Sequence, residues 1–210
     1  MKDEAWSVRP RLLVCLTFPF RPEAMPHLFE VLLALTEIRS MPLDVRVFTD
    51  CTNREDQRRL QELVYHMSLD AVRISINLHD TSNYPYLPLS WAHKPTLQAA
   101  FSTDNQDYTH FVYLDDLIRF SVRNLFYFLR YRPILRPYGL IPGFIQVEFS
   151  AQFGAIVLSD LPGPVKRQGR SAVDLGNIDF LCLDAPFVPM HVMDVDLVRE
   201  YLAWKIHQGG

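Results

Sequence analysis

The sequence predicts an α/β fold, a mainly parallel, doubly wound sheet flanked by helices, from two observations. Short apolar or alternating stretches typical of buried strands occupy residues 12–18, 43–49 and 71–78, and two amphipathic stretches separate them. Strands that alternate with helices form right-handed crossovers and therefore build a parallel sheet. The length of 210 residues and the 49% hydrophobic composition are those of a globular protein, so a single domain is expected over residues 1–210.

The two helices between these strands are predicted from apolar residues at steps of three and four. In the first helix these are Met25, Leu28, Phe29, Leu32 and Leu35, and in the second they are Leu60, Leu63, Val64 and Met67. The segment from Thr52 to Glu55 has the form of a capping box, which is expected to begin the second helix.

The second half of the chain is predicted with more irregular structure. Residues 80–90, rich in Asn, Pro, Ser and Tyr, indicate a surface loop before a helix that begins at Trp91, and residues 110–114 indicate a fourth strand. A helix after Ser121 is expected to end in an extended exit at Pro133 and Pro137. Residues 143–149 and 154–158 are expected to add an antiparallel pair to the sheet, residues 160–179 to form a loop, and the last helix to begin near Asp194.

Two adjacent acids, Asp115 and Asp116, directly follow the fourth predicted strand. Ligands of open α/β sheets bind at the carboxyl ends of the strands, so this position favours a binding role. Carboxylates are the ligands that Mg²⁺ and Mn²⁺ prefer, and these cations commonly bridge to substrate phosphates. The alternative is that the two acids only cap a turn or the following helix.

The segments around these acids resemble a family of A-type glycosyltransferase-like proteins. The resemblance lies in Leu89-Ser-Trp-Ala-His-Lys94, Tyr113-Leu-Asp-Asp-Leu-Ile-Arg-Phe-Ser121 and the segment from Leu125 to Glu148, which includes Pro142-Gly-Phe-Ile-Gln-Val-Glu148. The similarity extends over about residues 11–200 and is most specific between Leu89 and Glu148. The chain departs from the family pattern at Leu117, where the pattern has a third acid.

The resemblance implies transfer of a sugar from a nucleoside-diphosphate donor to a glycan or another hydroxyl acceptor. A divalent cation, Mn²⁺ or Mg²⁺, held by Asp115 and Asp116, would stabilise the departing diphosphate. Because further acceptor-side elements are expected after the last helix, the domain is predicted to lack C-terminal elements of the family.

Four other residues are candidates for binding the nucleotide sugar. Thr17 and Arg21 lie at and beyond the end of the first predicted strand, and Asp50 follows the second, where such folds receive a nucleotide. Lys94 could pair with the diphosphate as a point charge. Loop or capping roles are the alternative for the first three, and a solvent-directed lysine at a helix start is the alternative for Lys94.

An inverting transfer needs a general base near the acceptor hydroxyl, and the late acids Glu148, Asp194 and Asp196 are available. Glu148 and Asp194 are the catalytic candidates, although Asp194 could equally be the N-cap of the last helix. His93 and His191 are interpreted as structural or loop residues, because the histidines lack the spacing of a zinc site.

Composition excludes several other classes. The formal net charge of −3 and pI near 6.1 argue against a nucleic-acid partner. No stretch reaches the ~18 apolar residues that span a bilayer, and the three widely spaced cysteines, Cys15, Cys51 and Cys182, suit a reducing compartment, so a cytoplasmic location is expected. No Gly-x-Ser-x-Gly or phosphate-binding glycine loop follows a strand.

Two alternatives to a transferase remain open at this point. A catalytically silent domain with the same fold could bind a nucleotide, a glycan or a protein, and Leu117 favours this interpretation. A nucleotidyltransferase would use the same acids and metal to activate a phosphate.

Overall fold

The computed structural model describes residues 10–39, 41–79, 89–101, 108–158, 172–174, 178–181 and 189–203. Contacts divide them into two compact units, one up to Leu129 and again from Pro189, the other from Arg130 to Val188. The expectation of one domain over residues 1–210 stays a prediction. None of the helices in the described residues is long and apolar enough to cross a membrane.

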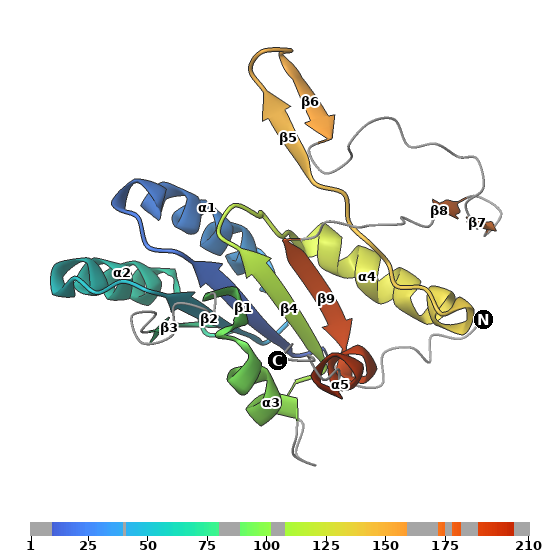
Figure 1. The fold of residues 1–210 in the computed structure, drawn as a ribbon, viewed down its shortest axis with the longest axis horizontal. Coiled ribbons are helices and arrows are strands. Elements are labelled where there is room, and N and C mark those ends of the chain that lie inside the picture. The colour runs from blue at the N-terminus through green and yellow to red at the C-terminus, as the bar shows by residue number, and fades with distance from the viewer. Residues whose placement is uncertain are drawn as a thin grey trace, which may run out of the picture. The chain divides into compact units, whose positions relative to one another are not determined.

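The first unit contains a five-stranded sheet in the order β3-β2-β1-β4-β9 (Figure 1). The strands are β1 (Leu12–Phe18), β2 (Leu43–Thr49), β3 (Val72–Leu78), β4 (His110–Asp115) and β9 (Met190–Asp194). The first four are parallel, and β9 pairs antiparallel with β4. The predicted α/β class with a mostly parallel sheet is therefore confirmed, and β9 is an edge strand that the sequence did not predict.

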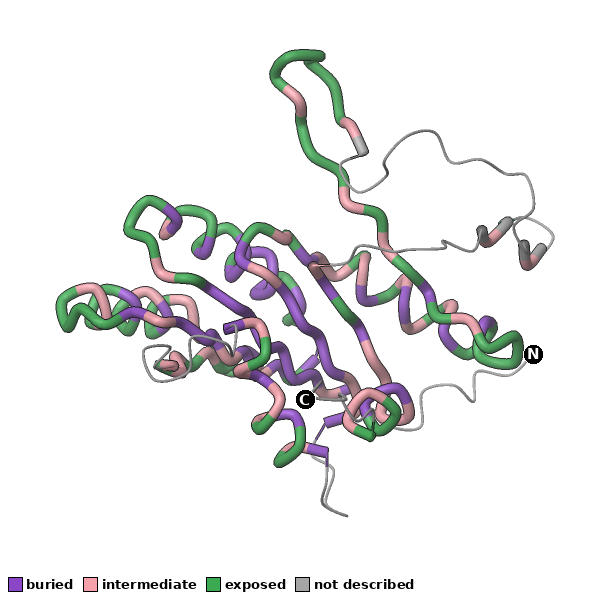
Figure 2. Tube along the Cα trace, viewed as in Figure 1, coloured by how far each residue is buried: buried purple, intermediate pink, exposed green. Residues whose placement is uncertain are grey.

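The centre of this sheet is buried on both faces. All seven residues of β1 and the four middle residues of β4 are buried, as the purple colour in Figure 2 shows. A central parallel strand packs against helices on both sides, so it lacks the polar alternation of a half-exposed strand. This is why the apolar run of residues 12–18 identified the strand correctly.

Helices α3 (Lys94–Phe101) and α5 (Val195–Ala203) contact each other and cover one face of the sheet. Leu97 of α3 and Val198 of α5 belong to one buried cluster with Leu13, Phe111 and Tyr113. Helices α1 (Met25–Thr36) and α2 (Arg54–Met67) contact each other, and α2 also contacts β3 (Figure 1). Short 3-10 helices η2 (Pro22–Ala24) and η3 (Leu89–Trp91) precede α1 and α3.

The start of α2 differs from the predicted capping box. The N-cap is Asn53 rather than Thr52, and its side-chain oxygen accepts hydrogen bonds from the backbone N–H groups of Glu55 (2.8 Å) and Asp56 (3.3 Å). Asn is as good an N-cap as Ser or Asp, so a one-residue shift costs the helix no capping energy.

Helix α4 (Val122–Leu135) continues through Pro133, and η4 (Arg136–Tyr138) follows it directly. The predicted extended exit is therefore wrong. A proline inside a helix removes one backbone hydrogen bond, but Leu135 beyond it is buried with an exposed fraction of 1%. Burial of this side chain favours continuation of the helix.

The second unit contains two small antiparallel pairs. One is the predicted hairpin of β5 (Val147–Ser150) and β6 (Ala155–Leu158), and the other is β7 (Ala172–Asp174) with β8 (Asp179–Leu181). The hairpin forms a sheet of its own, so its predicted addition to the main sheet is wrong, and β9 pairs with the edge of β4 instead. β7 and part of β8 lie in the segment predicted as a loop, and most of its other residues lie outside the described ranges.

Candidate functional site

The candidate site lies at the carboxyl ends of β1 and β4, where the strand order reverses. From β1 the chain adds β2 and β3 on one side, and β4 then pairs with the other side of β1. Such a switch point is the usual ligand position in an open α/β sheet. Thr17 of β1 pairs in register with Asp115 of β4, so the structure brings these two predicted residues together.

Asp115 interacts with Tyr113 of its own strand and with His191 of the neighbouring strand β9. The Tyr113 hydroxyl donates a hydrogen bond of 2.8 Å to Asp115 Oδ1. Burial raises the pKa of Asp115, while this hydrogen bond and the nearby His191 lower it in part. Burial also raises the pKa of Tyr113, and the carboxylate of Asp115 adds to that effect, so the phenol stays a donor at neutral pH.

Asp116 is a buried acid with an incompletely satisfied side chain. Its exposed fraction is 5%, and its Oδ2 is buried with no hydrogen-bond partner. Burial raises the pKa of Asp116, the Arg21 guanidinium lowers it, and Asp115 raises it by charge repulsion.

Arg21 forms an ion pair with this acid, with Nη2 3.7 Å from Asp116 Oδ2. Its side chain is 54% exposed, so it reaches the acid from solvent. Leu117, at the place of the third acid in the resembled pattern, is 62% exposed. The structure therefore puts two acids and one arginine at this edge, and an apolar side chain in solvent beside them.

Asp50, the candidate after β2, holds the loop that follows β1. Its Oδ1 accepts a hydrogen bond of 2.8 Å from the backbone N–H of Phe20. This contact links the ends of two neighbouring strands and fixes the loop that carries Arg21. Thr17 itself is buried with an exposed fraction of 4%, and its side chain partly offsets the raised pKa of Tyr113.

A pocket of about 310 Å³ lies against Tyr113 on the face covered by α3 and α5. Its lining combines aromatic rings, two imidazoles and one ammonium group: Ser90, Trp91, His93, Lys94, Tyr113, His191 and Tyr201. Lys94, predicted as a diphosphate ligand, therefore lies in this pocket, and Tyr113 joins the pocket to Asp115.

His93 forms the inner wall of the pocket. It is buried with an exposed fraction of 5%, and its ring stacks with Phe111 (5.7 Å) and Tyr201 (6.2 Å) and is tilted against Tyr113 (4.9 Å). Burial lowers the pKa of His93 to about 4, and the Lys94 charge contributes. The imidazole is thus neutral at pH 7, which agrees with the structural role predicted for it.

Of the two candidate general bases, Asp194 belongs to the first unit and Glu148 to the second. Asp194 pairs in register with His110 at the amino end of β4, and its Oδ1 accepts a hydrogen bond of 2.9 Å from Leu197 N–H, which makes it an N-cap of α5. The structure does not bring Asp194 to the edge of Asp115. Glu148 is an exposed residue of β5 in the second unit.

The donor set at the β4 edge suits a hard cation only with outside ligands. Among the described residues, no group of three or more His, Cys, Asp or Glu side chains is arranged to hold a metal ion. Mg²⁺ is commonly bound by one or two carboxylates together with substrate phosphates. Asp116 Oδ2, which has an ion pair with Arg21 but no hydrogen-bond partner, and the neighbouring Asp115 therefore fit a cation that arrives with a diphosphate.

Comparison with known proteins gives matches to solved structures. PcManGT, a mannosyltransferase from Pyrobaculum calidifontis in complex with GDP-Man and Mn²⁺, has 14% sequence identity and a TM-score of 0.41, covering 57% of this chain and 31% of that one. S. aureus TarS 1-349 has 11% identity and a TM-score of 0.38, covering 61% and 33%. These are glycosyltransferases of the A type.

A third structure of this type is mouse xyloside xylosyltransferase 1 in its apo form, with 14% identity and a TM-score of 0.30, covering 66% of this chain and 51% of that one. The chain thus spans between 31% and 51% of the lengths of these three proteins. No family model and no curated protein sequence matches it.

Several functional candidates were missed from the sequence. Trp91, Tyr113 and Tyr201 belong to three separate elements and meet only in the fold. His191 lies on β9, the strand that the sequence did not predict. A short alternating run at residues 190–194 was the one signal that could have identified this strand.

Proposed function

We propose that the chain is a glycosyltransferase domain that moves a sugar from a nucleoside-diphosphate donor to an acceptor hydroxyl. The observation that carries the proposal is the buried acid Asp116, one oxygen of which has no hydrogen-bond partner, beside Asp115 at the switch point of the sheet. A buried carboxylate oxygen without a partner costs free energy unless a ligand satisfies it. The resemblance of the segments around it to A-type glycosyltransferases supports the same activity.

Asp115 and Asp116 would hold Mn²⁺ or Mg²⁺ together with the phosphates of the donor. When bound, the cation would neutralise the charge that develops on the leaving diphosphate. Arg21 reaches Asp116 from solvent and would exchange this contact for a phosphate oxygen, since arginine matches phosphate geometry. Asp50 would keep the loop of Arg21 in place through its bond to Phe20.

The test is calorimetric titration of the chain with GDP and UDP, with and without Mn²⁺. We expect binding that requires the metal and is lost in Asp116→Asn, which keeps the shape of the side chain and removes its charge. The matched control is Glu62→Gln. The Glu62 carboxylate is 64% exposed on α2, and Glu62 does not belong to the strand ends that form the candidate site. Equal binding by Asp116→Asn with Mn²⁺ would overturn the proposed role of the acid pair.

A second candidate is a catalytically silent domain that binds a nucleotide without metal, and it is favoured by the exposed Leu117. Under this alternative, nucleotide binding by the wild-type chain would be the same with and without Mn²⁺. Leu117→Asp would then introduce a metal dependence, because it supplies the third acid of the resembled pattern. A metal requirement in the wild-type chain rejects this alternative.

A further inference from the structure

The pocket between α3, α5 and β4 has a chemistry of its own, distinct from the acid pair. Three aromatic side chains line it: Trp91 from η3, Tyr113 from β4 and Tyr201 from α5. Such side chains offer flat apolar faces next to groups that donate and accept hydrogen bonds. A sugar ring has the matching surface, with C–H groups on its faces and hydroxyl groups around its edge.

The inner wall of the pocket is rigid. His93 packs against Phe111, Tyr113 and Tyr201, and its Nε2 is 3.3 Å from the Tyr201 hydroxyl. Trp91 at the mouth has an exposed fraction of 37%. A fixed wall with a partly open aromatic ring lowers the entropy cost of holding a small ring-shaped ligand.

The charge in the pocket comes from Lys94. Its Nζ is 3.9 Å from the centre of the Trp91 ring and 5.1 Å from that of the Tyr201 ring. Within the described part of the chain Lys94 forms no ion pair, and burial lowers its pKa. An ammonium group that lies over two rings and has no acidic partner among the described residues can pair with an anionic ligand.

We propose that this pocket binds a sugar that carries a carboxylate or a phosphate group. The ring would pack on the aromatic walls and the anionic group would pair with Lys94. Resting on the proposed function, we infer that this acidic sugar is the acceptor, because Tyr113 both lines the pocket and donates a hydrogen bond to Asp115. Lys94 is then a ligand of the acceptor rather than of the donor diphosphate.

The experiment measures binding of four probes to the wild-type chain by calorimetry, without nucleotide or metal: glucuronate, glucose 6-phosphate, glucose and inorganic phosphate. We expect at least one of the two acidic sugars to bind about tenfold or more tighter than both glucose and phosphate. The two acidic probes separate carboxylate from phosphate recognition. The proposal would be overturned if glucose or phosphate bound as tightly as the tighter-binding acidic sugar, or if neither acidic sugar bound.

Variants test the two parts of the pocket. Lys94→Met keeps the stem and removes the charge, so it should abolish the preference for acidic sugars and leave weak binding of neutral ones. Trp91→Ala should weaken both kinds of sugar. Arg58→Met on α2 is the matched control for the loss of one positive charge and should change neither; its side chain is 68% exposed. Thermal unfolding checks that each variant is folded.

Competition separates this proposal from the proposed function. If GDP or UDP displaces the acidic sugar and Lys94→Met loses nucleotide binding, the pocket belongs to the donor and the acceptor assignment is wrong. If acidic sugars bind but no nucleotide does, the pocket stands and the transferase proposal fails. If nucleotide binds in a metal-dependent manner but no sugar binds, the transferase proposal stands and the acidic-sugar pocket is wrong.

Discussion

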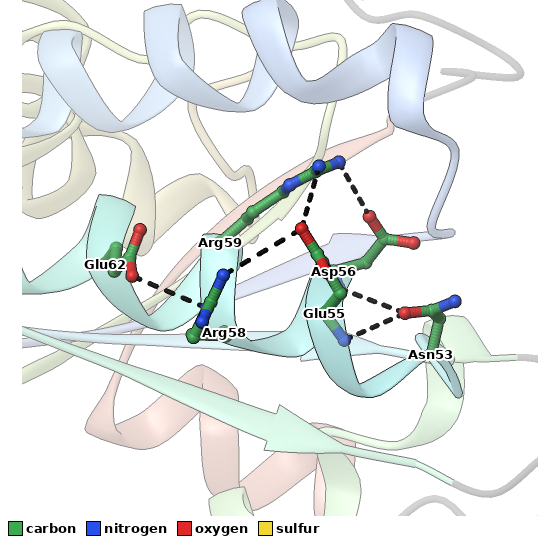
Figure 3. A network of polar contacts seen from close by, with 6 residues as sticks. All are labelled: Asn53, Glu55, Asp56, Arg58, Arg59 and Glu62. Atoms are coloured by element: carbon green, nitrogen blue, oxygen red, sulfur yellow. Dashed lines mark hydrogen bonds and ion pairs between the residues drawn. The ribbon is translucent and has the colours of Figure 1, made fainter.

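Helix α2 and the carboxyl end of β4 both carry several charged groups, but they satisfy them in opposite ways. On α2, Arg58 pairs with Glu55 and Glu62, and Arg59 pairs with Glu55 and Asp56 (Figure 3). Every partner lies three or four residues away on the same helix, and most of these side chains are more than half exposed. The result is a solvated network that any helix with this spacing would form.

The acids at the end of β4 also interact with residues from distant parts of the chain. Asp116 faces Arg21, which follows β1, while Asp115 is affected by His191 of β9. One buried oxygen of Asp116 keeps no hydrogen-bond partner. Exposed ion pairs contribute little to the free energy of folding, because their charges stay hydrated. Buried charges carry a large desolvation cost unless a partner or a ligand compensates it. The two regions therefore differ in how far their charges are satisfied within the chain, and the less satisfied one is the region that we propose for binding.

The largest expected effect concerns His93 and pH. The pKa of His93 falls from 6.5 to about 4 on folding. As the pH falls through 6.5, this imidazole therefore becomes protonated in the unfolded chain while it stays neutral in the folded chain. Stability is lost over this window, by up to about 3 kcal/mol. His93→Phe should remove this loss in urea unfolding between pH 7 and pH 4.5.

Asp115 and Asp116 act in the opposite direction, because their raised pKa values favour the folded state as the pH falls. Subtracting the unfolding free energy of the wild type from that of His93→Phe at each pH cancels this contribution. His66→Phe, at an exposed position of α2, is the control. Parallel pH profiles for His93→Phe and the wild type would contradict the burial of a neutral imidazole.

The next effect is the hydrogen bond from Tyr113 to Asp115. Tyr113→Phe keeps the ring and removes the donor from a partly buried carboxylate, so we expect a loss of about 2 kcal/mol at pH 7. Tyr65→Phe, at a side chain that is 78% exposed on α2, should lose almost nothing. Urea unfolding measures both, and similar values for the two variants would mean that water replaces the Tyr113 hydroxyl.

A smaller effect is expected at the N-cap of α2. Asn53→Ala leaves the N–H groups of Glu55 and Asp56 without their side-chain acceptor and should cost about 1 kcal/mol. Asn53→Asp should keep most of the stability, because aspartate caps equally well. A loss in Thr52→Ala as large as that in Asn53→Ala would contradict the position of the cap.

The smallest effect is expected within the charged face of α2. Arg58→Met removes two exposed ion pairs and should change the free energy of unfolding by less than about 0.5 kcal/mol. The change should shrink further in high salt, because exposed pairs are screened. A salt-independent loss above about 1 kcal/mol would mean that these pairs act as a buried network.

The parallel strands and their helices were predictable because burial of one or both faces leaves a regular pattern of apolar residues in the local sequence. Residues 12–18 and 110–114 are apolar runs, and the described strands β1 and β4 contain them. The positions of Asp115 and Asp116 at a strand end were predictable for the same reason. The hairpin at residues 147–158 was predicted as a pair but assigned to the wrong sheet, since local pattern does not tell which edge is occupied.

The sequence by itself determined the α/β class, the order of the parallel strands along the chain and the acids that end β4, since burial periods and residue types are local properties. The tertiary structure alone decided that β9 covers the β4 edge and that Trp91, Tyr113 and Tyr201 line one pocket together with Lys94. These contacts join segments separated by tens of residues. Their geometry depends on the packing of helices on the sheet, which no local pattern specifies.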